Sequence, residues 1–154
     1  MRKFAVIALT VLLLLSCSDS EDVRPMIGTY VHYDDNGAAA VCYRSDDTFS
    51  YIESIAYTDA CLIEGTWSVD LDQYNFKTAR GTLSMVVDEV PSGFSGLLLS
   101  EGRNSMEFYW YTQDESPVLT WIYNETDSSK NYTFYYSGDE SALDSIVSEW
   151  SETV

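Results

Sequence analysis

The sequence predicts an all-β fold, an antiparallel up-and-down barrel or sandwich of about 8–10 strands with one C-terminal amphipathic helix. Three observations lead to this prediction. From residue 27 onward, apolar and polar residues alternate in short runs, as in strands that bury one face. Turn residues separate the runs at hairpin-length intervals, and no long crossover helix interrupts them, which argues against a parallel sheet. After residue 139 the apolar spacing becomes helical.

The candidate strands combine apolar or aromatic residues with flanking Gly, Pro, Asn or Asp. They are 27–33, 38–43, 48–56, 61–70, 74–78, 82–87, 94–99, 106–112, 118–123 and 132–136. Asn36-Gly37 separates the first two, and this pair is the strongest short hairpin signal because both residues tolerate positive φ. In the fourth run, alternate residues from Cys61 to Val69 share one face and polar residues from Glu64 to Asp70 share the other. One face of that strand should be buried and the other wet.

The C-terminal segment is expected to form a helix over residues 139–150. Four apolar residues recur at i, i+3, i+4 and i+7: Leu143, Ile146, Val147 and Trp150. Ser137, with Glu140 three residues later, fits a capping box. So short a helix is marginal alone, so its apolar stripe should pack on the β domain rather than recruit a partner.

The N-terminal segment resembles the signal of a bacterial lipoprotein. Arg2 and Lys3 precede an apolar run from Phe4 to Leu15, which is shorter than the roughly 20 residues that span a bilayer. Ser16 and Cys17 complete a pattern similar to a lipobox, so residues 1–16 are predicted to be a signal peptide and Cys17 to carry acyl chains such as palmitate. Residues 17–26 are then the lipidated cysteine and a flexible acidic tether. We expect a protein anchored in the cell outer membrane, facing the periplasm or the cell surface.

The composition limits the partners. Removing residues 1–16 takes away two basic residues and no acid, which leaves six basic and 25 acidic residues and a charge of −19. Such a surface repels nucleic acid. It would attract a cationic protein or metal ions, or simply keep the domain soluble. The remaining length suits one domain, residues 27–154.

Cys42 and Cys61 are a candidate pair for a disulfide, because exported proteins retain such bridges. The predicted topology puts them on the outer two of three neighbouring strands, about 9–10 Å apart sideways, whereas a disulfide needs Cα atoms within about 7 Å. A bridge and two buried thiols both remain open.

Two Gly-x-aromatic units mark the first half of the chain, Gly28-Thr29-Tyr30 and Gly65-Thr66-Trp67. Between them a polar turn, residues 45–47, leads into an aromatic strand. This arrangement resembles the lipocalin-like domains of small lipoproteins of the Bacteroidota. The resemblance covers roughly residues 27–87 and implies a small barrel that binds a ligand, with no catalytic residue to carry over.

Catalytic patterns are missing from the sequence, so no enzyme activity, metal or cofactor is expected. His32 is the only histidine, and no Cys-His cluster offers a zinc site. The sequence contains no Gly-x-Ser-x-Gly, phosphate loop or Gly-x-Gly-x-x-Gly.

The excess of aromatic residues suggests a binding surface. In the run 106–112, Phe108 and Trp110 share one face with Met106, while Tyr109 and Tyr111 lie on the other. One set should pack inside the fold. Tyr109, Tyr111 and the later Trp121 are the candidate ligand-binding residues, on an exposed platform that suits sugars or proteins; core packing is the alternative for each.

Two functions fit these features. The first is a non-catalytic binding module for a small apolar or glycan ligand, held in a barrel mouth or on the tyrosine face. The second is an acidic surface lipoprotein that binds or inhibits a cationic protein such as lysozyme. A pocket lined by Trp67 and Trp110 would favour the first, and a solidly packed barrel the second. Salt should weaken the second kind of binding more strongly.

Overall fold

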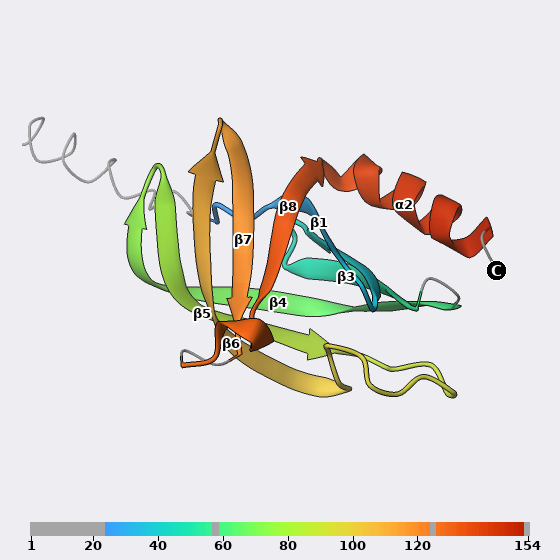
Figure 1. The fold of residues 1–154 in the computed structure, drawn as a ribbon. Helices are drawn as coiled ribbons and strands as arrows, with labels where there is room; N and C mark the ends of the chain where they lie inside the picture. The colour runs from blue at the N-terminus through green and yellow to red at the C-terminus, as the bar shows by residue number, and fades with distance from the viewer. Residues whose placement is uncertain (1–23, 57–58, 124–125, 153–154) are drawn as a thin grey trace, which may run out of the picture.

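The computed structural model describes residues 24–56, 59–123 and 126–152. In these residues, eight antiparallel strands follow one another around a closed barrel, and β8 returns to pair with β1 (Figure 1). The strands are β1 (Gly28–Asp34), β2 (Gly37–Tyr43), β3 (Thr48–Ile55), β4 (Asp59–Asn75), β5 (Thr78–Val87), β6 (Gly102–Gln113), β7 (Ser116–Ile122) and β8 (Tyr132–Gly138). A 3-10 helix, η1 (Ser128–Lys130), precedes β8, and helix α2 (Glu140–Glu152) follows it. The prediction of an all-β barrel with a C-terminal helix is confirmed, and the sandwich alternative is excluded.

Strand β4 is longer than predicted. The run 74–78 is not a strand of its own, because β4 continues to Asn75 and a two-residue turn leads directly to Thr78 of β5. The side-chain oxygen of Asn75 accepts hydrogen bonds from the backbone N–H groups of Lys77 and Thr78, at 2.9 and 3.0 Å. An Asx turn therefore closes a hairpin where the sequence was interpreted as a strand.

The predicted strand 94–99 is wrong, because these residues belong to the loop between β5 and β6. Gly93 and Gly96 have φ angles of 96° and 77°, in the left-handed region, which no extended strand adopts. Leu99 is buried, and its neighbours Leu97 and Leu98 pack against the barrel core. The apolar character of the run comes from this packing rather than from strand pairing.

The inward-facing side chains form one buried cluster that fills the barrel. Its largest members are mostly aromatic: Trp121, Tyr30, Tyr43, Tyr51, Phe49, Phe108 and Phe134. At Gly65, beside this cluster, a Cβ atom would come within 1.9 Å of the carbonyl oxygen of Val86. The glycine of the Gly65-Thr66-Trp67 unit is therefore explained by the close approach of β5 to β4.

Helix α2 packs on the outside of the barrel, as its apolar stripe predicted. Leu143 and Ile146 share a buried cluster with outward-facing residues of the first three strands: Val31, Ala40, Cys42 and Ile52. The ring of Trp150 meets that of Tyr33 edge-on at 6.3 Å. Strand β2 is therefore buried on both faces, under the helix on one side and against the core on the other.

The start of α2 is one residue later than predicted, and its end two residues later. Asp139 rather than Ser137 caps it, since the Asp139 carboxylate accepts hydrogen bonds from the backbone N–H and the hydroxyl of Ser141, at 3.0 and 2.6 Å. These two bonds lower the pKa of Asp139.

The folded domain begins before the predicted boundary at residue 27. Met26 is fully buried in the core. The Arg24 guanidinium lies 5.5 Å from the ring centre of Trp67, binds the Asp47 carboxylate and donates to the Ser45 carbonyl at 2.8 Å. The prediction that the flexible tether extends to residue 26 is therefore wrong for residues 24–26.

Cys42 and Cys61 are buried free thiols, so the possible disulfide between them is not formed. They lie on opposite faces of the sheet, Cys42 in the cluster under α2 and Cys61 in the barrel core. In the register, Cys42 lies opposite Ser50, whereas Cys61 lies opposite Glu53. Burial raises the pKa of both thiols, which reduces their reactivity.

Candidate binding site on the outer face of the barrel

The interior of the barrel is a packed core. Trp67, Trp110 and Trp121 are 3%, 6% and 0% exposed. The indole nitrogen of Trp110 donates to the Tyr30 hydroxyl, and that of Trp121 to the Tyr43 hydroxyl, both at 3.2 Å. Burial raises the pKa of both tyrosines. Within the described residues, these core groups satisfy one another rather than facing a space for a ligand.

The prediction that Trp121 belongs to the exposed platform is wrong. Trp121 lies opposite Phe108 in the pairing of β6 with β7, so both side chains point inward. Its ring centre is 4.5 Å from that of Phe134. Trp121 is thus on the opposite face of the sheet from Tyr109 and Tyr111.

Tyr109 and Tyr111 lie together on the outer face of β6, as the alternation predicted. Their rings are stacked, with centres 5.3 Å apart and an angle of 24° between the planes. Arg80, which lies opposite Tyr109 on β5, places its guanidinium 5.8 Å from the Tyr109 ring centre. Both tyrosines are half-buried.

Two adjoining hollows open beside this tyrosine pair. One, of about 470 Å³, is lined by Gln73, Thr78, Arg80, Tyr109 and Ile122. The other, of about 220 Å³, is lined by Asp72, Gln73, Arg80, Gly81, Glu107 and Phe108. Because they share Gln73 and Arg80, we describe them together as the tyrosine groove.

A β-bulge in β4 shapes the floor of the tyrosine groove. The register with β5 shifts between Leu71 and Gln73, so Gln73 rather than Asp72 lies opposite Arg80. At Gly81 a Cβ would come within 2.0 Å of the carbonyl oxygen of Asp70. The bulge and this glycine bring the two backbones close together, and Gln73 lines the same hollow as Tyr109.

The tyrosine groove combines a flat ring with several hydrogen-bonding groups. Arg80 supplies donors, Gln73 both donors and acceptors, and Glu107 acceptors. Sequence reasoning missed all three. Glu107 could have been assigned from the sequence, because the alternation along the strand puts it on the same face as Tyr109 and Tyr111. Gln73 and Arg80 lie on other strands, and only the strand register brings them to this face.

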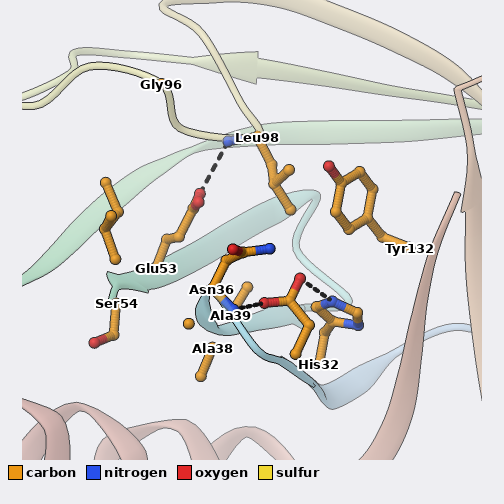
Figure 2. A pocket seen from close by; sticks show the side chains of 12 residues that line it. His32, Asn36, Ala38, Ala39, Glu53, Ser54, Gly96, Leu98 and Tyr132 are labelled. Carbon is orange, nitrogen blue, oxygen red and sulfur yellow. Dashed lines mark hydrogen bonds and ion pairs between the residues drawn. The ribbon is translucent and has the colours of Figure 1, made fainter. Parts of the chain in front are cut away.

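A separate hollow of about 200 Å³ lies between the first hairpin and the loop that follows β5 (Figure 2). Glu53 lines it and accepts hydrogen bonds from the Tyr51 hydroxyl at 2.6 Å and the backbone N–H of Leu98 at 2.9 Å. Nδ1 of His32 donates to the carbonyl of Thr133 at 2.8 Å, since a carbonyl can only accept. This hollow is smaller than the usual range for ligand pockets, roughly 300–1,000 Å³.

The comparisons with known proteins identify no relative. No protein-family model, curated protein or solved structure matches this chain. Among the described residues, no three or more His, Cys, Asp and Glu side chains are grouped so that they could hold a metal ion. The same residues contain no helix with the length and apolarity to cross a bilayer. Cys17, the predicted lipid attachment site, lies outside the described residues.

Proposed function

We propose that this protein is a non-catalytic binding module of the cell envelope that binds a glycan in the tyrosine groove. The observation that carries the proposal is the stacked pair Tyr109 and Tyr111 beside Arg80 and Gln73. A tyrosine ring offers a rigid apolar face with a polar edge, which suits the C–H face of a sugar. Neighbouring amide, guanidinium and carboxylate groups can bond the hydroxyls that surround such a face.

A small apolar ligand inside the barrel is less well supported. The side chains that would line such a cavity, Trp67 and Trp110, are buried in the core. Burying an apolar ligand there would require displacing packed rings, and close-packed interiors resist insertion. Of the two ligand classes predicted from sequence, the geometry thus favours the glycan.

The envelope location rests on the N-terminal sequence. Residues 1–16 have the charged, apolar and small-residue order of an export signal, and Cys17 follows directly. Acyl chains on Cys17 would hold the barrel at the outer membrane as part of a lipocalin-like lipoprotein. Mass spectrometry of the mature N-terminus tests this part: an acylated Cys17 supports it, and a free Cys17 thiol or a retained signal contradicts it.

A glycan array probed with the mature chain tests the binding activity. We expect binding to a restricted set of glycans. Tyr109→Ala should weaken the affinity for them at least tenfold, because the sugar loses its stacking surface; a tenfold loss corresponds to about 1.4 kcal/mol of binding free energy. Tyr135→Ala is the matched control, since Tyr135 is 58% exposed on β8 and does not line the groove. Equal loss in both variants, or no binding to any glycan, would contradict the proposal.

A second candidate, binding of a cationic protein, is favoured by the charge of the surface and by the packed interior of the barrel, which leaves Trp67 and Trp110 in the core rather than in a pocket. The described residues include 21 acidic and six basic side chains. Four of the acids lie on α2, at Glu140, Asp144, Glu149 and Glu152, and its last turn has no basic residue. Titration with lysozyme at low and high salt separates the two: saturable binding that salt abolishes supports this candidate, whereas glycan binding in the groove should resist salt.

A further inference from the structure

The tip of the β4–β5 hairpin is the most exposed aromatic feature of the described residues. Phe76 is 77% exposed and Tyr74 48% exposed. The Lys77 ammonium lies 5.6 Å from the Phe76 ring centre. The Asn75 side chain accepts hydrogen bonds from the backbone N–H groups of Lys77 and Thr78 and so holds the turn in shape. Phe76 is therefore exposed on an ordered turn.

This hairpin projects from one end of the barrel (Figure 1). Strand β4 pairs with β3 only as far as Thr66, opposite Thr48, and then continues to Asn75 beside β5. Nine residues, Trp67 to Asn75, lie beyond that last pair. At about 3.3 Å per residue they carry Asn75, at the base of the tip, up to about 30 Å past Thr66.

The N-terminal segment enters the fold at the same end. Arg24 contacts the Trp67 ring, where β4 leaves β3. Cys17 precedes Arg24 by seven residues, and seven residues span at most about 25 Å. An acylated Cys17 would therefore hold Trp67 within about that distance of the bilayer, and the tip lies at a comparable distance from Trp67, within reach of the same surface.

We propose that the β4–β5 tip is a second membrane contact, with Phe76 and Tyr74 in the headgroup region of a zwitterionic bilayer. The proposal rests on the lipid anchor at Cys17, not on glycan binding. Aromatic rings favour the membrane interface, and a lysine beside them can extend its ammonium to the headgroups. Asp114 and Glu115, in the adjacent β6–β7 turn, disfavour anionic lipids at this end of the molecule.

Tryptophan quenching in vesicles tests the contact. The mature chain, residues 17–154, is coupled through the Cys17 thiol to maleimide lipids in phosphatidylcholine vesicles; Cys42 and Cys61 are buried and should not react. Phe76→Trp is compared with Leu62→Trp, whose site is 41% exposed on β4 toward the other end of the barrel. Phosphatidylcholine with brominated acyl chains quenches tryptophans that reach the bilayer.

We expect the tryptophan introduced at position 76 to lose most of its added emission and to shift to the blue, while that at position 62 keeps both intensity and wavelength. Equal emission at the two positions would overturn the contact. Because the coupling is chemical, this result does not depend on cellular acylation. A mature protein without acyl chains on Cys17 would overturn the anchor, and with it the proposed contact in the cell, independently of the glycan result.

Discussion

The two faces of β6 carry similar aromatic residues in opposite environments. Inward, Phe108 and Trp110 are buried in the core, and the Trp110 indole is hydrogen-bonded to Tyr30. Outward, Tyr109 and Tyr111 stack on each other at the edge of a groove. The inner rings fill space for stability, whereas the outer pair presents half-buried ring surface at the edge of the groove. We therefore propose that ligand recognition takes place on the outer wall rather than in the interior.

Truncation of an inner ring should produce the largest effect. We expect Trp121→Ala to lower the free energy of unfolding by about 3–5 kcal/mol, because it leaves a cavity among packed rings and removes the donor to Tyr43. Urea denaturation followed by circular dichroism measures this. Tyr135→Ala, on the exposed outer wall, should cost under about 1 kcal/mol. Similar losses in the two variants would break the distinction between the faces.

Alkaline pH should destabilise the protein through the same inner face. Burial raises the pKa of Tyr30, Tyr43 and Tyr51 in the folded state. Stability is therefore complete below the unfolded-state pKa of about 10 and is lost as the pH rises above it, because the unfolded chain releases protons that the fold retains. The tyrosinate absorbance of these three buried tyrosines should appear only together with the loss of ellipticity. Ionisation of all of them before any loss of ellipticity would contradict the prediction.

Loss of the Arg80 guanidinium should weaken binding without unfolding the protein. We expect Arg80→Gln to reduce affinity for an array-selected glycan about fivefold to tenfold, since it removes a charged hydrogen-bond donor from the tyrosine groove. Isothermal titration calorimetry measures the change. Arg103→Gln makes the same charge change on the outer face of β6, outside the groove, and should retain the wild-type affinity.

Substitutions in the β6–β7 turn should raise the stability of the folded protein by a smaller amount. Asp114 and Glu115 have φ angles of 50° and 66°, a backbone that favours Asn-Gly. The double variant Asp114→Asn, Glu115→Gly should therefore raise the stability by about 1 kcal/mol. The control Asp88→Asn, Glu89→Gly makes the same side-chain changes where φ is negative and should give no gain. Equal melting temperatures for the two variants would show that the turn stores no strain.

Addition of a reducing agent should have the smallest effect on stability. Because Cys42 and Cys61 lie on opposite faces of the sheet as free thiols, a reducing agent should leave the melting temperature unchanged. Alkylation under denaturing conditions, without prior reduction, should label both cysteines. A mass deficit of one disulfide would contradict this expectation.

The sequence contained the alternation that separates the two faces of β6 and the helical spacing of α2, because both depend on local periodicity. The position of Trp121 was also implied by the sequence. A two-residue turn at 114–115 places it opposite Phe108, hence inside, but Asp-Glu is not a recognisable turn of that type. Pairing register and β-bulges depend on contacts between distant segments. Gln73 and Arg80 could therefore not be assigned to the groove before the strands were aligned.

The filled interior was equally hidden from sequence reasoning. A barrel of eight strands is compatible with a cavity or a core, and the choice depends on the combined volume of all inward side chains. Here Trp121, Tyr43, Tyr51 and their neighbours occupy that volume. The expectation of a ligand in the barrel mouth followed from the type of fold rather than from these residues.

Nuclear magnetic resonance of the ring signals tests the central claim most directly, that ligand is recognised outside the barrel. The protein, labelled in its tyrosine rings and tryptophan indoles, is titrated with a glycan selected on the array. We predict saturable shifts of the Tyr109 and Tyr111 rings, with the indole signals of Trp67, Trp110 and Trp121 unchanged. Shifts that appear first in those three indoles would place the ligand inside the barrel and contradict the account.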